Sequence, residues 1–437
     1  MSSESFAALD PAAQAAVRSA QLARKQARQQ QKQARLQAKL QAKQQEAPAA
    51  SEYRSCISKD EYFEAGRGGL FRDPSLPPTA ESLALLLRAL EAGDEQARRL
   101  GLCAYFQFGS GARAEQEAVW DATFNARLAW EGFFTITTSR GAGGRTEPLP
   151  ELQPFYGVLL WPNFEASRHV RRALARLCSE RRGLALSNCA DPERTWQHIE
   201  RYHRAMHDSN WLTRRYFEMM QAASDDPSIN FTLHCIELAA EAAEGGAADG
   251  ATPPSLHAGG HARLTGLSGR ADLNGGEARL LHFAPEAGRW AVEMDGSREA
   301  VRVKEANLVA LPPPPPPLAG EIGFSVGRVY TSLSGWTGER TADSIGTAQL
   351  VLLGRWLQRR GYAFWSLGHC YSPEMEYKRK LGHRIYPRAD FRALLRRHRG
   401  PFELGGDGDG GGSGGAEREA AFEPLRRGER CPESQLL

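Results

Sequence analysis

Four arginines share one face of a predicted helix and have no acidic neighbour to balance them. Within 167–182, Val170, Leu174 and Leu177 recur at helical spacing and form the apolar face. The opposite face carries Arg168, Arg171, Arg172 and Arg176. No acid occurs among them before Glu180, so ion pairs at i,i+4 spacing do not explain the charge. A charged helical face is usually just solvated, but like charges at this density repel one another. We therefore interpret this face as a phosphate-binding surface.

The stretch 319–383 has the pattern of a site for a ligand. It begins with two apolar segments around a Val326-Gly327 turn, as in a β-hairpin. A helix follows, with Ser344 where an N-cap belongs and Gly361 where the helix should end. The short aromatic segment 362–367 is then typical of a buried strand. In a strand–strand–helix–strand unit of this kind, a ligand can bind at the point where the strands separate.

The elements that position these residues predict an α+β protein. A length of 437 residues allows two or three domains. We expect a smaller N-terminal α+β domain over 51–205. We expect a second domain to be formed by 206–240 together with 318–400, because the patterns of strand and helix resume after an interruption.

The segment 241–317 is that interruption. Short strands recur over 261–311 and are separated by turn dipeptides such as Asn274-Gly275, which predicts a small SH3-like β-barrel. The six prolines at 312–317 add a stiff spacer. The strands on either side of the insertion can pair with each other. Its two ends must then lie close together, as in a domain inserted at a hairpin tip.

Both ends of the chain have biased compositions. Residues 1–50 form a basic low-complexity tail, with eight Lys or Arg and no acid over 18–43. A helix-prone disordered tail, a phosphate-contacting arm and an organellar transit peptide all remain open for it. The segment 401–437 is rich in glycine, and we expect it to be disordered.

The cysteines predict neither a disulfide framework nor a metal site. All seven are scattered, and none shows C-x-x-C spacing. We therefore expect reduced thiols in a cytoplasmic compartment, and no metal or other cofactor. No apolar run approaches the ~20 residues that span a bilayer, so no membrane association is expected. The net charge of +3 is too small to indicate a partner.

A series of short motifs resembles one enzyme family. In chain order the motifs are NWLTR, HCIEL, GEIGFSVGRVY, SLSGW, GTAQL, FWSLG, KLGH and YPRADF. With the insertion set aside, this order is similar to that of the leucyl/phenylalanyl-tRNA–protein transferases. The pieces ARLAWEGFFTI and MEYK look more like the eukaryotic and algal type. The resemblance covers about 120–240 and 318–395.

The resemblance implies a fold and an activity. The fold is an acetyltransferase-like (GNAT) C-terminal domain joined to a smaller N-terminal domain. The activity is transfer of a hydrophobic amino acid, Leu or Phe, from aminoacyl-tRNA to the N-terminal amine of an acceptor protein. The product carries a destabilising N-terminus that is read by proteolysis. The family uses no cofactor, and we expect a monomer whose partners are aminoacyl-tRNA and the acceptor N-terminus.

The family's functional residues match several positions of this chain. Trp211 falls on the tryptophan that contacts the terminal adenosine of tRNA, and the arginine-rich helix falls on the family's basic helix. Ser334 and Trp336 match the segment that forms the aminoacyl pocket, which Phe364 would help to line. The remaining matches among substrate-binding residues are Thr213, Arg214 and Glu237. A lone acid on a strand, such as Glu237, is more often one half of a structural ion pair.

The chain departs from the family where acids are expected. The family's acid that engages the substrate α-amine aligns with Leu333, and its catalytic aspartate aligns with Ser366. The glutamine two residues later is Gly368. A serine cannot act as a carboxylate base, so we consider Glu374 or Glu376 as substitutes. The alternative function is a catalytically weakened protein that binds tRNA or N-terminal peptides.

A different activity on the same fold class is acyl transfer from acyl-CoA. Enzymes of that type bind pyrophosphate at a glycine-rich helix N-terminus. The segment with Gly346 and Ala348 has the small residues, but Asp343 stands where a cation or amide belongs. An acid at that place repels pyrophosphate, which disfavours this activity.

Overall fold

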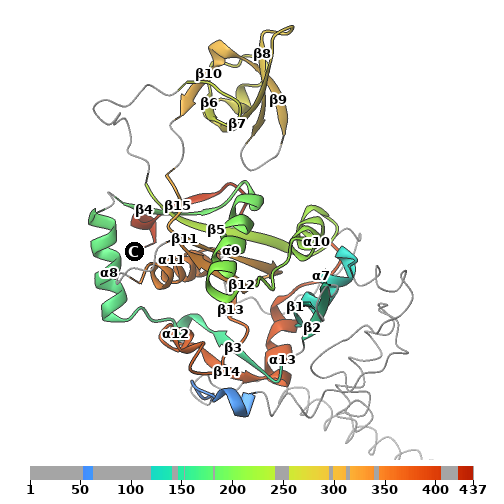
Figure 1. Ribbon diagram of the computed structural model, residues 1–437, viewed down its shortest axis with the longest axis vertical. Helices are drawn as coiled ribbons and strands as arrows, with labels where there is room; N and C mark the ends of the chain where they lie inside the picture. Colours follow the sequence, from blue (N-terminus) through green and yellow to red (C-terminus); the bar gives the residue numbers. More distant parts are fainter. Residues whose placement is uncertain are drawn as a thin grey trace, which may run out of the picture. The chain divides into compact units, whose positions relative to one another are not determined.

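The computed structural model describes a large part of the chain (Figure 1). The described residues are 53–62, 120–139, 146–151, 153–180, 183–241, 255–294, 299–311, 315–338, 344–404 and 422–436. The basic tail 1–50, the prolines 312–314 and the Gly-rich segment 405–421 lie outside them. This part of the chain is mixed α+β, as predicted. None of its helices combines the length and the apolar character needed to cross a membrane.

An eight-stranded mixed sheet forms the centre of the fold. Neighbouring strands are antiparallel, except for one parallel pair, β12 and β13. In spatial order the strands are β14 (Arg384–Pro387), β3 (Phe155–Leu159), β13 (Phe364–Ser366), β12 (Val329–Thr337), β11 (Ala319–Val326), β5 (Thr232–Ala240), β4 (Leu184–Asn188) and β15 (Arg430–Pro432).

Helices cover both faces of this sheet (Figure 1). On one face, here called the α11 side, lie α8 (Arg168–Glu180) and α11 (Ile345–Arg359). The other face is called the α9 side. It is covered by α7 (Ala122–Trp130), α9 (Pro192–His207), α10 (Arg214–Asp225) and α13 (Arg388–His398). Alternation along the strands divides the core in two, so that Phe364 is buried on the α9 side and its neighbour Trp365 on the α11 side.

Smaller elements complete this part of the fold. The α7 helix begins where the Asp121 carboxylate accepts a hydrogen bond from the Phe124 amide at 2.7 Å, and Gly132, at φ 94°, turns the chain into β1. The remaining elements are β1 (Phe134–Ser139), β2 (Thr146–Glu151), η2 (Trp161–Asn163), α12 (Glu376–Arg379) and η5 (Glu433–Gln435).

The expected boundary at residue 205 does not separate two sheets. It falls inside α9, and β3 and β4 lie in the same sheet as β5 and β11. The expected disordered tail also contributes to the fold, because β15 pairs with β4 and Leu436 is buried on the α11 side. A three-residue strand within a charged segment has no periodicity from which it could have been predicted.

The insertion forms a five-stranded antiparallel sheet. Its order is β10-β6-β7-β8-β9, and within the described residues β10 and β9 stay unpaired with each other, so no closed barrel is formed by these strands. The elements are β6 (His261–Leu264), η3 (Ala271–Leu273), β7 (Glu277–Ala284), β8 (Arg289–Met294), β9 (Ala300–Lys304), η4 (Glu305–Asn307) and β10 (Leu308–Leu311). The flanking strands β5 and β11 pair in register, with Leu238 opposite Ala319. The two ends of the insertion therefore lie side by side.

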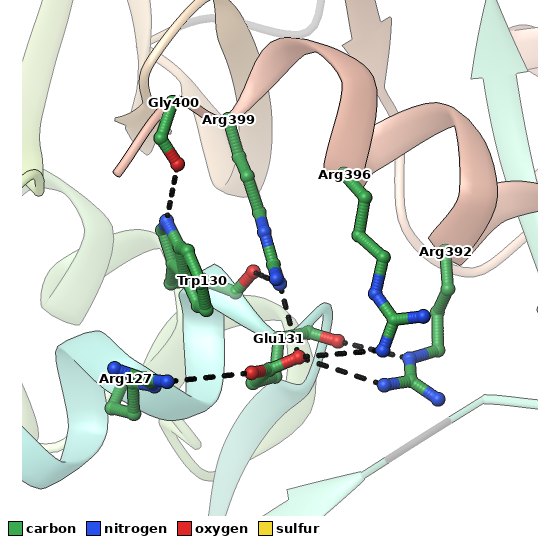
Figure 2. A network of polar contacts seen from close by, with 7 residues as sticks. All are labelled: Arg127, Trp130, Glu131, Arg392, Arg396, Arg399 and Gly400. Atoms are coloured by element: carbon green, nitrogen blue, oxygen red, sulfur yellow. Dashed lines mark hydrogen bonds and ion pairs between the residues drawn. The ribbon is translucent and has the colours of Figure 1, made fainter. Parts of the chain in front are cut away.

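One buried carboxylate ties α7 to α13. Glu131 follows α7, and its carboxylate is surrounded by arginines (Figure 2). The nearest is Arg399, which donates to Glu131 Oε2 at 3.0 Å and to the Trp130 carbonyl oxygen at 2.7 Å. Three more guanidinium groups lie within 4.0 Å of the carboxylate, those of Arg127, Arg392 and Arg396. Pairing offsets the cost of burying these charges, and the network fixes the start of β1.

Candidate functional site

The parallel strands β12 and β13 separate after a short contact. They pair only over Val329–Thr331 and Phe364–Ser366, and α11 connects them. Beyond Thr331, β12 continues along β11 to Thr337, whereas β13 ends. The sheet therefore opens beside Ser366, which is the kind of opening expected in the stretch 319–383.

A β-bulge in β12 adjoins this opening. Ser332 lies opposite Gly323 and Ser334 opposite Ile322, so Leu333 has no partner on β11. The extra residue changes the alternation of side chains. The hydroxyl of Ser332 forms hydrogen bonds with residues of the α11 side, whereas the hydroxyl of Ser334 forms one with a residue of α9. In a regular strand the side chains of these two serines would point to the same face of the sheet. The bulge directs them to opposite faces.

On the α11 side the opening is backed by a buried carboxyl group. Glu321 is 2% exposed, and its Oε1 accepts hydrogen bonds from Tyr330 Oη at 2.9 Å and from Ser332 Oγ at 2.8 Å. Trp365 Nε1 donates to the same Ser332 hydroxyl at 2.9 Å. A Cβ atom at position 323 would lie 2.4 Å from Tyr330 Oη, so Gly323 is what allows this tyrosine to reach the carboxyl.

The Glu321 carboxyl is bound by hydroxyl donors. Within the described residues no cationic side chain forms an ion pair with it. Burial raises the pKa of its carboxyl to about 7. The hydrogen bonds from Ser332, Tyr330 and Gln349 and the charge of Lys378 offset only part of that rise. A buried acid with this pKa, next to an opening, is a candidate for function. The motif GEIGFSVGRVY contains Glu321, but no role was predicted for it, although it is the single acid in a strand whose eight residues are all buried.

On the α9 side the opening is backed by a chain of neutral hydrogen bonds. Ser334 Oγ lies 2.8 Å from His203 Nε2, and His203 Nδ1 lies 2.8 Å from Asn210 Oδ1. The Asn210 amide is oriented by its other partners, because its Nδ2 donates to the Leu212 carbonyl oxygen at 2.8 Å and to the Glu200 carboxylate. Its Oδ1 therefore faces the imidazole, and Nδ1 of His203 carries the proton.

The protonation state of His203 follows from its surroundings. Burial lowers the pKa of its imidazole, which keeps the ring neutral. The lone pair of Nε2 then points at the hydroxyl of Ser334, which donates to it. Ser334 was predicted from the sequence, whereas His203 and Asn210 were not. They lie 131 and 124 positions away in the chain, and only the fold brings them together.

One aromatic ring lies between Trp211 and the loop that follows β13. Trp211 is half-buried, and its ring centroid lies 6.0 Å from that of Phe134. Phe134 in turn lies 5.5 Å from the ring of His369, in the loop that follows β13. The same loop contains Gly368, where φ is 65° and a Cβ atom would lie 3.1 Å from Phe134. The structure thus brings Trp211 and the FWSLG loop together.

A buried lysine holds this loop. Lys378 Nζ donates to the carbonyl oxygens of Leu367 and His369, the latter at 2.8 Å. Burial lowers the pKa of its amine to about 8. Ser366 itself is 1% exposed and pairs with Thr331 and Val158 at the last rung before the opening.

Other residues predicted from the sequence have structural partners. Glu237 accepts a hydrogen bond from Thr195 Oγ1 at 2.7 Å and forms an ion pair with Arg194. Arg214 forms exposed ion pairs with Glu193 and Glu218, at 2.6 and 2.7 Å. These contacts explain both residues without a ligand.

Three further residues predicted to bind substrate lie at different places. One is in the core, one is near Ser334, and one caps a helix. Phe364 is fully buried against Phe391 of α13, so it belongs to the core and does not line the opening. Trp336 is stacked on His198 of α9, with ring centroids 4.2 Å apart, close to Ser334 in the chain. Thr213 occupies the N-cap position of α10.

The two acids considered as substitutes for Ser366 are engaged elsewhere. Glu374 forms an ion pair with Lys59 at 2.5 Å, and Glu376 pairs with Arg379. Both ion pairs are exposed to solvent. The idea that either takes the role of a carboxylate at position 366 is therefore not supported, whereas Glu321 and His203 are buried proton-binding groups near the opening.

The arginine face lies across the sheet from Trp211. Arg168, Arg171, Arg172 and Arg176 are exposed on α8, whose apolar face packs on the α11 side. No carboxylate of the described residues forms an ion pair with Arg168, Arg171 or Arg172. The expected helix with a basic outer face is therefore present.

No metal centre is apparent in the described part of the chain, where no three His, Cys, Asp or Glu side chains are grouped to hold an ion. A comparison of the sequence with protein-family models gives no match, and a comparison with curated proteins gives none either.

Proposed function

We propose that this chain transfers a hydrophobic amino acid, Leu or Phe, from aminoacyl-tRNA to the N-terminal amine of an acceptor protein. The observation that carries the proposal is the separation of β12 from β13 beside the bulge at Leu333. It is supported by the order of the family motifs along the chain. In this proposal the eight-stranded sheet is an acetyltransferase-like domain, and the five-stranded sheet is an SH3-like insertion.

The terminal adenosine of tRNA would stack on Trp211. Stacking of an unpaired base on an aromatic ring is worth about 1–3 kcal/mol and tolerates any base. The loop after β13 contacts Phe134, and Phe134 contacts Trp211, so an adenosine at Trp211 would bring its aminoacyl ester toward this loop. The arginines of α8 would meet phosphates of a more distant part of the same tRNA.

Glu321 would supply the negative charge that Leu333 lacks. In the family an acid at that position engages the α-amine of the substrate. Here the hydroxyl of Ser332, next to the bulge, joins the Glu321 carboxyl to the Trp365 indole at the end of β13. An ammonium group bound beside Ser332 would stabilise the charged form of Glu321, which burial alone disfavours.

Transfer does not require the missing aspartate. An N-terminal amine has a pKa of about 7.7–8.0, so a large fraction is free base near neutral pH. An aminoacyl ester is already activated, and positioning alone can lower a barrier by up to ~7–11 kcal/mol.

The alternative is a protein of the same fold that binds tRNA or N-terminal peptides without turnover. The observation that favours it is Ser366, which is buried at the end of β13 where the family has its catalytic carboxylate. Both proteins would bind tRNA in a salt-dependent manner, so only turnover separates them.

The test is a transfer assay with tRNA charged with Leu or Phe and a peptide that begins with Arg. We expect transfer by the full chain, and slower transfer by Trp211→Ala with recovery in Trp211→Phe. Ser366→Asp serves as the restored variant. If neither the natural chain nor Ser366→Asp transfers, whereas both bind tRNA, the chain is a binding protein.

A further inference from the structure

We propose that Ser334 is a nucleophile that carries the acyl group as a covalent ester during transfer, with His203 as its general base. This inference rests on the proposed function, because the aminoacyl ester is the donor of the acyl group. It adds a covalent step, which the family resemblance does not imply.

The hydrogen-bond chain gives Ser334 a base in the right tautomer. Asn210 accepts the Nδ1 proton of His203, so Nε2 is left as an acceptor at 2.8 Å from the serine hydroxyl. An adjacent imidazole oriented by a third group is the arrangement that activates a serine. Asn210 acts here as a positioning residue, because it touches the imidazole and not the substrate.

Ser334 is also accessible. It is half-buried, and the next residue, Gly335, is exposed. The bulge at Leu333 turns the Ser334 hydroxyl toward α9 at the point where β13 no longer covers β12. An ester bound in this opening can therefore reach the hydroxyl, whereas Ser366 at the last paired rung is buried.

The chemistry balances without a further reactant. Ser334 Oγ attacks the ester carbonyl carbon, and His203 Nε2 takes the hydroxyl proton. The bond to the tRNA 3′-oxygen breaks, and that oxygen leaves with the proton from His203. The N-terminal amine of the acceptor then attacks the new serine ester and forms the amide. The serine oxygen is released and regains a proton, which the amine loses through His203.

The sheet contains a matched control for this chain. Ser325 Oγ lies 2.9 Å from His234 Nε2, and His234 Nδ1 lies 3.2 Å from Asn188 Nδ2. The Asn188 Oδ1 accepts from the Cys235 amide, so its Nδ2 faces the imidazole and donates to Nδ1. His234 therefore carries its proton on Nε2 and donates to Ser325. The same residue types occur, but here the histidine cannot act as a base for the serine.

The test uses an activated ester and no tRNA. The full chain is mixed with the p-nitrophenyl ester of leucine, the release of nitrophenolate is followed, and the protein is quenched and mapped by mass spectrometry. We expect a burst of about one nitrophenolate per chain and a leucyl ester on Ser334. His203→Gln should slow the burst ~10²–10⁴-fold. Ser325→Ala should keep the burst per folded molecule.

Two outcomes overturn the proposal. One is a burst and an acyl group that persist in Ser334→Ala. The other is the absence of any burst in a natural chain that transfers amino acids from tRNA, since transfer would then be direct. A burst on Ser334 in a chain that never accepts an amino acid from tRNA would instead overturn the proposed function. Ser334 would still be shown to act as a nucleophile.

Discussion

The eight-stranded sheet holds two chains of serine, histidine and asparagine that differ in direction and in access. In the first chain the asparagine accepts from the histidine, and in the second it donates to it. The first ends on a half-buried serine at the opening, and the second is closed inside the core. The chains are Ser334–His203–Asn210 and Ser325–His234–Asn188.

The difference shows that residue types alone do not define a site. In each chain a third contact orients the asparagine amide: the Leu212 carbonyl oxygen for Asn210, and the Cys235 amide for Asn188. That contact decides which imidazole nitrogen carries the proton. The closed chain is expected to act on stability and the open chain on chemistry. Two of the four predictions below test this division directly, and the other two concern Glu321 and the arginines of α8.

The largest expected effect is on acid stability. Burial lowers the pKa of His234 to about 3, from an ordinary value of 6.5. The unfolded chain therefore binds more protons between these values, and stability is lost as pH falls from 6.5 toward 3, by up to about 5 kcal/mol. Urea unfolding at several pH values should show a flatter acid limb in His234→Gln than in the natural chain. Parallel curves would contradict this assignment.

The second prediction concerns the carboxyl on the other side of the opening. Glu321→Gln keeps an acceptor for Ser332 and Tyr330 but removes the charge. A hydrogen bond to a charged group is worth about 1.5–3 kcal/mol, so transfer at pH 8 should fall ~10- to 100-fold. Rates are measured with charged tRNA, and unfolding confirms that the variant is folded. Glu237→Gln is the matched variant, because Glu237 is equally buried but paired with Arg194. It should lower stability and keep the rate per folded molecule.

The third prediction compares the two serines in stability. Ser325→Ala leaves the Nε2 proton of His234 without its acceptor inside the core, which should cost about 1–3 kcal/mol. Ser334→Ala should cost less than about 1 kcal/mol, because water can reach His203 from the opening. Unfolding free energies in urea give both values. Equal losses would mean that the open chain is as structural as the closed one.

The smallest effect is expected far from both chains. Replacing Arg168, Arg171 and Arg172 by Gln should make tRNA binding less dependent on salt. The slope of log K against log salt should fall by about one for each phosphate that these side chains no longer neutralise. Stability should not change, because the three side chains are exposed and form no ion pair with a described acid. Replacing Arg289 and Arg302, which are exposed on the five-stranded sheet, is the control. An unchanged slope would leave the α8 face as a solvated surface.

Much of the framework could be predicted from the sequence. Local patterns predicted the hairpin of β11 and β12, the helix α11 and the arginine face of α8. The pairing of β5 with β11 across the insertion followed from their flanking positions. These features depend on periodicity and turn chemistry within short windows.

The groups at the site were harder to predict, because they depend on contacts between distant segments. The bulge at Leu333 turns Ser334 toward His203, and no local pattern shows either the bulge or the contact. Glu237 matched a family motif, yet Arg194 pairs with it. Glu321 lies within the motif GEIGFSVGRVY but was assigned no role from the sequence, yet it is a buried acid with which no cation of the described residues forms an ion pair.

The role of Ser334 is tested most directly by a rapid quench of the full chain with Leu-tRNA in the absence of acceptor peptide. We expect leucine to move from tRNA to Ser334, and then to an Arg-initiated peptide when that peptide is added. Leucine that stays on tRNA until the peptide arrives, and is then found on the peptide without ever being found on Ser334, would contradict it.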